Sequence, residues 1–187
     1  LVRSRGLGDV YKRQEQLEAI GAQVVYGIVG LKTHAKMLLV TRREGRLLRR
    51  YGHLSTGNYN RRTAALYTDI SYLTADPAIT SDMDQLFGHL ASQSCLPKMK
   101  RLLVAPFQLH ADMLARIRAV GQAAARGVFA RIVLKMNALT DVPLIEALLA
   151  AGQQGAKIDL IVRGACMLPA GVAVSYTHLR AHETVLD

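Results

Sequence analysis

The sequence predicts an α/β protein in two parts, each with a mixed or largely parallel sheet and flanking helices. Segments rich in Val, Leu, Ile and Tyr, typical of strands, dominate the first part of the chain. Further along, similar segments alternate with stretches whose apolar residues recur every three or four positions, typical of amphipathic helices. Strand–helix–strand alternation favours a parallel sheet. A proline and a basic run at residues 97–101 indicate a linker between the two parts.

The first part is expected to contain four strands and then a helix. The strands are predicted at residues 23–29, 34–41, 46–53 and 68–74. A helix is predicted to begin near Ser81, because Ser81 and Asp84 have the spacing of a capping box. Its inward face is expected to carry Met83, Leu86, Phe87 and Leu90.

The second part is expected to alternate. Strands are predicted at residues 101–105, 130–136 and 157–162, the last ending at Arg163. The first helix between them carries the apolar positions Leu109, Met113, Ile117, Val120 and Ala124 and ends near Gly127. The second begins at Thr140 and Asp141, and its inward residues are expected to be Val142, Ile145, Leu148 and Leu149.

The two ends of the chain are related through their coding DNA. Residues 4–14 can be back-translated into a string whose reverse complement encodes residues 174–184. Two natural protein segments have no reason to share one inverted string, and it resembles an adapter used to build sequencing libraries. Residues 1–14 and 174–187 are therefore predicted to be artefacts. The informative chain is then 15–173, with one domain expected at 15–98 and another at 99–173.

The composition indicates a polyanionic partner. The chain has 24 Lys and Arg against 14 Asp and Glu, a formal charge of +10. Nucleic acid, nucleotide phosphates and an anionic surface all fit this charge. No run approaches the roughly 18 uninterrupted apolar residues of a membrane span. The 2 cysteines form neither a metal motif nor a disulfide framework, so a reducing cytoplasm is the default expectation.

His34, Lys36 and Asn58 suggest phosphoryl-transfer chemistry. Residues two apart on a strand point to the same face, so His34 and Lys36 are expected to lie side by side. A neutral imidazole is a nucleophile toward phosphorus, and an adjacent ammonium stabilises charge on the transferred group. Asn58 ends the loop Ser-Thr-Gly-Asn and has an amide that can donate to the same oxygens. A strand end with a lone histidine and a solvated lysine fits the motif equally well.

Five segments carry a resemblance to a known family. They are GLKTHAKMLLVTRR (30–43), STGNYNRRTAALYTDISYLTADPAI (55–79), LLVAPF (102–107), LKMNALTD (134–141) and KIDLIVRGACML (157–168). Together they resemble the polymerising bacterial polyphosphate kinases, in the two carboxyl-terminal domains of that family. The resemblance covers nearly all of residues 15–173, and it implies the phospholipase-D-like fold.

The resemblance assigns roles to individual residues. His34 matches the histidine that the family phosphorylates, and Tyr67 and Arg163 match residues that contact the nucleotide. Lys36 and Asn58 are added from the chemistry above. Arg42, Arg43, Arg61 and Arg62 are candidates to guide a polyanion.

The resemblance also implies the reaction and the partners of an intact enzyme. The γ-phosphate of ATP passes reversibly to polyphosphate, with Mg²⁺ as cofactor, and no metal-ligating residue is assigned in this chain. The expected partners are ATP, ADP and inorganic polyphosphate, without nucleic acid or an integral membrane segment. An intact enzyme is expected to be a cytoplasmic homo-oligomer, with peripheral attachment at the inner membrane left open. The fragment alone is expected to be inactive.

The sequence departs from the family pattern in several places. Ser55 stands where the family usually has glycine. The chain is expected to end before the family's second active-site histidine and to begin after its magnesium-associated arginines. His89 and His110 are expected to be solvated, and His53 to be a structural strand residue, so none is expected to replace that histidine.

Two rival functions are weighed against this one. A phospholipase-D-like phosphodiesterase or nuclease would have Asp five residues after the lysine, where this chain has Thr41. A non-catalytic polyanion-binding module needs no histidine at position 34, and the chain shows no basic stripe interleaved with aromatic residues.

Overall fold

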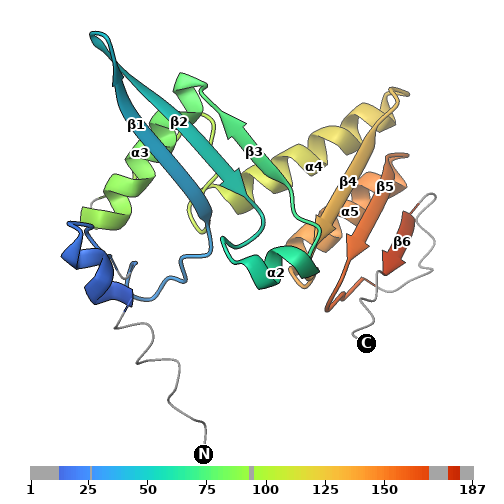
Figure 1. Ribbon diagram of the computed structural model, residues 1–187. Coiled ribbons are helices and arrows are strands. Elements are labelled where there is room, and N and C mark those ends of the chain that lie inside the picture. Colours follow the sequence, from blue (N-terminus) through green and yellow to red (C-terminus); the bar gives the residue numbers. More distant parts are fainter. Residues whose placement is uncertain (1–12, 26, 93–94, 169–176, 182–187) are drawn as a thin grey trace, which may run out of the picture. The chain divides into compact units, whose positions relative to one another are not determined.

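The structure is a computed structural model that describes residues 13–25, 27–92, 95–168 and the backbone of 177–181. The chain divides into two compact units, Leu1–Leu102 and Leu103–Asp187. Each unit is described by itself (Figure 1). No helix among the described residues is long and apolar enough to span a membrane.

The first unit is built on an antiparallel sheet. Strands β1 (Lys36–Glu44), β2 (Leu47–Ser55) and β3 (Ser71–Thr74) lie in the order β1-β2-β3. A two-residue turn joins β1 to β2, and Gly45 takes a positive φ of 63° there, which favours glycine. The prediction of a largely parallel sheet is wrong for this unit, because consecutive strands joined by a short turn pair antiparallel.

Helix α3 (Pro77–Ser92) covers one face of this sheet. The side chains of Met83 and Thr80 lie against Gly52 of β2, where a Cβ atom would collide with the Met83 sulfur. The helix begins earlier than predicted. Asp76 caps it by accepting a 2.7 Å hydrogen bond from the Ala78 N–H, so the capping box predicted at Ser81 is wrong.

Three predictions about which side chains are buried are also wrong. Phe87 on α3 is 39% exposed and Val142 is 50% exposed, although both were assigned to inward faces. His89, expected to be solvated, is only 8% exposed. The adjacent positions Met83 and Leu86 are buried as predicted, so the error at Phe87 and His89 is a small rotation of the assigned face.

The strand predicted at residues 23–29 is absent from the described part of that segment. Gly27 and Gly30 have positive φ values of 84° and 80°, and these interrupt an extended backbone. A short helix that was not predicted, α2 (Arg61–Leu66), follows β2. Asn60 caps it by accepting hydrogen bonds from Arg62 N at 3.0 Å and Thr63 N at 3.2 Å.

A buried carboxylate organises the segment after α3. Asp82 is 0% exposed and accepts hydrogen bonds from the backbone N–H groups of Lys100, Arg101 and Leu102 at 2.6–3.1 Å. Burial opposes ionisation of Asp82, but these hydrogen bonds outweigh it and lower the pKa of its carboxyl group. The strand predicted at residues 101–105 is absent, and the N–H groups of Arg101 and Leu102 at its start donate to Asp82 instead of to a neighbouring strand.

The second unit has a parallel sheet. Its strands β4 (Arg131–Met136), β5 (Lys157–Val162) and β6 (Thr177–Ala181) lie in the order β4-β5-β6. Helix α4 (Leu109–Ala125) and helix α5 (Val142–Gln153) match the two predicted helices. Asp141 caps α5 as predicted, by accepting a 2.9 Å hydrogen bond from the Leu144 N–H. The core includes Ile117, Ile132, Ile145, Leu148, Ile158 and Leu160.

Strand β6 falls in the segment 174–187 that was predicted to be adapter-derived. Most of that segment, like most of 1–14, lies outside the described residues. The prediction about the two ends therefore stays a prediction.

Candidate functional site

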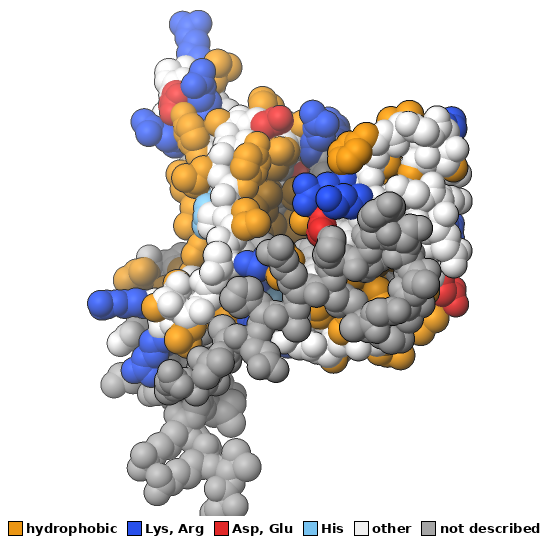
Figure 2. Space-filling model, turned by 90° about the vertical axis from the view of Figure 1, so that its right-hand side faces the viewer, with side chains coloured by type: hydrophobic (Ala, Val, Ile, Leu, Met, Phe, Trp, Pro, Cys, Tyr) orange, Lys and Arg blue, Asp and Glu red, His pale blue; other side chains and the backbone are white. Residues whose placement is uncertain are grey.

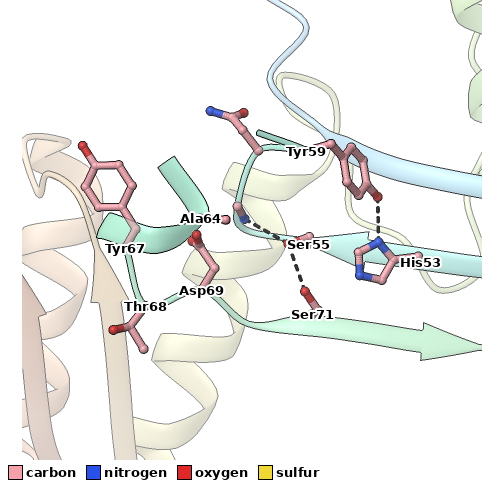
Figure 3. A pocket seen from close by; sticks show the side chains of 10 residues that line it. His53, Ser55, Tyr59, Ala64, Tyr67, Thr68, Asp69 and Ser71 are labelled. Atoms are coloured by element: carbon pink, nitrogen blue, oxygen red, sulfur yellow. Dashed lines mark hydrogen bonds between the residues drawn. The ribbon is translucent and has the colours of Figure 1, made fainter. Parts of the chain in front are cut away.

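A pocket of about 460 Å³ lies in the first unit, around the end of β2 and the loop that follows it (Figure 3). Its walls come from β2, from the loop Ser-Thr-Gly-Asn, from α2 and from the segment that leads into β3. The lining residues are His53, Ser55, Gly57, Asn58, Tyr59, Ala64, Tyr67, Thr68, Asp69 and Ser71. Two of the predicted site residues, Asn58 and Tyr67, therefore line one cavity.

Hydrogen bonds of two serine hydroxyl groups connect the loop at residues 55–58 to β3. Ser71 donates a 3.2 Å hydrogen bond to the Ser55 Oγ, which also accepts the Gly57 N–H at 3.0 Å (Figure 3). Ser55 and Ser71 are cross-strand partners. Ser55 thus has a defined role in closing the turn.

His34 and Lys36 lie together, as predicted. The Lys36 Nζ is 3.1 Å from the Nδ1 and 3.2 Å from the Nε2 of His34, and it donates a 2.7 Å hydrogen bond to the His34 carbonyl oxygen. Lys36 is the first residue of β1, whereas His34 lies just before the strand and is exposed. The strand predicted at residues 34–41 thus begins two residues later than expected.

The register of the sheet relates this pair to the pocket. Lys36 is the cross-strand partner of Ser55, and directly opposed residues project from the same face of a sheet. Ser55 lines the pocket, whereas His34 and Lys36 are not part of its wall. The histidine–lysine pair and the pocket therefore belong to the same end of the sheet.

His53 is a candidate site residue that the sequence reasoning missed. Its Nδ1 lies 2.7 Å from the Tyr59 hydroxyl group, the two ring centroids are 5.5 Å apart, and both residues line the pocket (Figure 3). The spacing offered a signal, because His53 is two residues before Ser55 and shares its face of β2. The partner Tyr59 lies beyond a loop, and strand periodicity says nothing about such a contact.

Arg163 follows β5 in the second unit, at the carboxyl end of a parallel strand. Its Nε and Nη2 atoms lie 3.1 Å and 2.8 Å from the Asn137 Oδ1, and Asn137 directly follows β4. This matches the expectation that Arg163 ends a buried strand.

The charges of the site are unevenly distributed. The residues that line the pocket include the carboxylate of Asp69 and no lysine or arginine. Arg43, Arg61 and Arg62 are exposed elsewhere in the first unit, and Arg42 lies 3.3 Å from the Glu44 carboxylate. Figure 2 shows lysine and arginine side chains in separate groups on the face it draws, next to exposed hydrophobic side chains.

The described residues contain no cluster of side chains that could hold a metal ion without a substrate. Within residues 13–25, 27–92 and 95–168, no group of three or more His, Cys, Asp or Glu side chains could hold a metal ion. Mg²⁺ needs oxygen ligands and is commonly bound by one or two carboxylates together with substrate phosphates. Among the residues that line the pocket, Asp69 supplies the carboxylate.

Comparison with known proteins decides the family. Residues 10–96 match the model of polyphosphate kinase C-terminal domain 1, and residues 102–186 match that of polyphosphate kinase C-terminal domain 2. The chain belongs to the polyphosphate kinase family. The two matches extend into the segments predicted to be adapter-derived, and they do not decide that prediction.

Individual polyphosphate kinases support the assignment. The chain is 52% identical over 171 residues to the polyphosphate kinase of Xylella fastidiosa, which covers 91% of this chain and 24% of that protein. It is 50% identical over 157 residues to that of Pseudomonas putida, with coverage of 84% and 22%. The chain thus spans about a quarter of the length of these relatives.

A solved polyphosphate kinase structure supports the fold. The crystal structure of polyphosphate kinase from Porphyromonas gingivalis matches with a TM-score of 0.79 and 32% identity, covering 90% of this chain and 28% of that one. This likeness, together with the antiparallel and parallel sheets of the two units, confirms the predicted fold class, α/β and phospholipase-D-like.

Proposed function

We propose that the protein to which this chain belongs is a reversible ATP:polyphosphate phosphotransferase and that His34 carries the phosphoryl group between the two substrates. Membership of the polyphosphate kinase family supports the substrates. The observation that carries the proposal is the contact of His34 with Lys36, whose Nζ lies 3.1 Å and 3.2 Å from the two ring nitrogens. This contact puts a cation beside an exposed imidazole.

The reaction on His34 has two steps. In the first, a ring nitrogen of neutral His34 attacks the γ-phosphorus of ATP, the bond from that phosphorus to the β,γ-bridging oxygen breaks, and ADP leaves. In the second, a terminal oxygen of polyphosphate attacks the same phosphorus and the phosphorus–nitrogen bond breaks. The polymer is then one phosphate longer, and neutral His34 is restored.

Lys36 is proposed to contact His34 before ATP binds and the phosphoryl oxygens once ATP is bound. A ring nitrogen cannot accept a proton from Lys36 and attack phosphorus with the same lone pair. Binding of the triphosphate must therefore move the ammonium from His34 to the phosphoryl oxygens, where it stabilises the charge of the transition state. The lysine side chain is a flexible four-carbon stem, so a change of its rotamer can supply this movement.

The other proposed residues hold the substrate. Asn58 donates from its side-chain amide to the transferred phosphoryl group, while Tyr67 and Arg163 contact the nucleotide. The pocket supports the roles of Asn58 and Tyr67, since both line it. The end position on β5 supports the role of Arg163, because ligands of such sheets bind at the carboxyl ends of the strands.

The remaining features of the parent enzyme are proposed from the family. Its partners are ATP, ADP and inorganic polyphosphate, and Mg²⁺ accompanies the nucleotide and neutralises phosphate charge. We keep residues 15–98 and 99–173 as parts of two domains, and the compact units that meet at residues 102 and 103 support this division. A cytoplasmic homo-oligomer, with attachment to the inner membrane surface left open, completes the proposal.

A pulse–chase experiment on the intact enzyme tests this function. The uninterrupted gene is expressed whole, and the enzyme is incubated with γ-labelled ATP, separated from nucleotide and then mixed with unlabelled polyphosphate. Acid-labile label should form on the enzyme and move into polymer during the chase. Polymer labelled directly from ATP, with no label on the enzyme at any time, would mean that the phosphoryl group passes without a phosphohistidine.

A further inference from the structure

Thr56 is the centre of a hydrogen-bond relay between two segments that are far apart in the sequence. The Ile70 N–H donates to the Thr56 Oγ1 at 3.0 Å, and the Thr56 hydroxyl group lies 2.9 Å from the Asp69 Oδ1. The Thr56 N–H also donates to the Ile70 carbonyl oxygen at 3.1 Å. The loop after β2 is thereby tied to the segment before β3.

The chemistry of the three groups fixes the direction of this relay. A backbone N–H only donates, so the Thr56 Oγ1 accepts from Ile70. The carboxylate of Asp69 accepts, so the hydroxyl proton of Thr56 points to Asp69. The Thr56 hydroxyl group therefore donates one hydrogen bond and accepts another. Valine has the same shape as threonine but can neither donate nor accept a hydrogen bond through its side chain.

Gly57 adds a steric contact to the hydrogen bonds. A Cβ atom at position 57 would collide with the carboxylate of Asp69, whose Cγ would be only 2.6 Å away. The backbone of the loop therefore lies directly on the Asp69 side chain. Asp69 supports the loop through a hydrogen bond at position 56 and through close packing at position 57.

The relay joins the two segments that carry the proposed substrate contacts. Asn58 comes two residues after Thr56, Tyr67 comes two residues before Asp69, and both line the same pocket. We propose that Thr56 and Asp69 form a positioning pair that holds Asn58 and Tyr67 at the spacing required to bind a nucleoside triphosphate. This inference rests on the proposed function, in which both residues contact the nucleotide substrate.

The pair acts through other residues, so its loss should affect substrate binding more than chemistry. Without the relay, Asn58 and Tyr67 move independently and lose entropy when the nucleotide orders them. We expect the KM for ATP to rise about tenfold, a change of about 1.4 kcal/mol. At saturating ATP, labelling of His34 should continue at a rate close to that of the unchanged enzyme.

The test uses paired variants of the full-length enzyme. Thr56→Val removes the hydroxyl group and keeps the shape, while Thr56→Ser keeps the hydroxyl group. We expect Thr56→Val and Asp69→Ala each to raise the KM for ATP about tenfold, Thr56→Ser to stay near the unchanged value, and the double variant Thr56→Val/Asp69→Ala to be no worse than the worse single one. Thr41→Val, the same change at an exposed strand position, is the matched control.

Two results would overturn the positioning pair: an unchanged KM in Thr56→Val, or additive effects of the two single changes. If Asp69→Ala does not fold, the comparison of Thr56→Val with Thr56→Ser still tests whether the Thr56 hydroxyl group matters. Equal KM values for these two variants would count against the positioning pair. Failure of the proposed function looks different, because the unchanged enzyme would then carry no label on His34, whatever the KM values of the variants.

Discussion

At the scale of single residues, the candidate site depends on contacts between near neighbours in the sequence. His34 and Lys36 are two residues apart, and the Ser55 Oγ accepts the N–H of Gly57 two residues on. Strand periodicity predicted the first contact, because residues two apart share a face. Such local pairs can be found in a sequence, whereas the contact of Thr56 with Asp69 spans 13 residues and has no local pattern.

Replacing Lys36 tests its proposed role at the transition state. Lys36→Ala removes the cation beside His34, and the loss of one such donor typically slows the chemical step by about a hundredfold or more. Labelling of His34 from ATP, followed by rapid quench in the full-length enzyme, should slow by that factor. Lys36→Arg keeps the charge and serves as control, and labelling of Lys36→Ala at the unchanged rate would remove Lys36 from the mechanism.

Replacing Gly57 tests the packing of the loop. Gly57→Ala places a methyl group against the carboxylate of Asp69, and overpacking of this kind costs about 1–3 kcal/mol. We expect a lower thermal unfolding midpoint for the full-length enzyme and a higher KM for ATP. Gly88→Ala is the control, because a Cβ atom at that helical position meets nothing within 4 Å. Equal stability of the two variants would show that the loop has room to move.

At the scale of elements, one buried carboxylate connects a helix to the segment that follows it. Asp82 on α3 accepts hydrogen bonds from three consecutive backbone N–H groups at residues 100–102. A buried donor that loses its partner costs about 1–3 kcal/mol. The carboxylate of Asp82 therefore supplies the hydrogen-bond acceptors that a neighbouring strand would otherwise supply to these N–H groups.

Removal of this carboxylate should release the segment. In the full-length enzyme, Asp82→Ala leaves the three N–H groups without their acceptor, so trypsin should cleave faster after Lys98, Lys100 and Arg101. The matched control is Asp84→Ala. It removes an exposed carboxylate on the same helix, and that carboxylate forms a 2.8 Å ion pair with Arg50. Equal cleavage of the two variants would contradict the role given to Asp82.

The same carboxylate should contribute to the pH dependence of stability. Hydrogen bonds lower the pKa of Asp82 in the folded protein below its unfolded value. Its contribution is therefore fully present above the unfolded pKa and is lost as the pH falls through the lower, folded pKa. The difference in unfolding free energy between the unchanged enzyme and Asp82→Asn should shrink below about pH 4, where the unfolded carboxyl group titrates. A difference that stays constant down to pH 2 would contradict this.

The elements that the sequence predicted well are those with a strong local pattern. Strands β1 to β5 were expected from the residue composition typical of strands, and helices α3, α4 and α5 from apolar periodicity. The errors arose where distant residues decide the structure. Residues 101–105 have the composition of a strand, but the N–H groups of Arg101 and Leu102 donate to Asp82, and Asp76 rather than Ser81 caps α3. The contact of His53 with Tyr59, which lies beyond the loop, was not predicted either.

At the scale of the whole molecule, the chain spans only part of the length of its relatives. It spans 24% of the Xylella fastidiosa relative and 28% of the Porphyromonas gingivalis structure. Many apolar side chains of the first unit are exposed, among them Leu38 at 48%, Leu73 at 79% and Leu47 at 66%. Exposed apolar side chains in such number are expected where a part is separated from the surface that covers it.

The isolated chain should accordingly be inactive and only marginally stable. We expect no ATP-dependent polymer synthesis from the 187-residue chain under conditions in which the full-length enzyme is active. We also expect a shallow thermal transition and binding of a dye for exposed apolar surface. The full-length enzyme is the control, and sustained polymer synthesis by the isolated chain would show that it contains a complete site.

The most direct test of the central claim is to locate the phosphoryl group on the enzyme. The full-length protein and its His34→Ala variant are incubated with γ-labelled ATP, digested under conditions that preserve acid-labile phosphate, and mapped by mass spectrometry. We expect phosphate on His34 in the unchanged enzyme, with loss of both the label and polymer synthesis in the variant. Polymer synthesis that survives in His34→Ala would contradict it and leave His34 with a structural role.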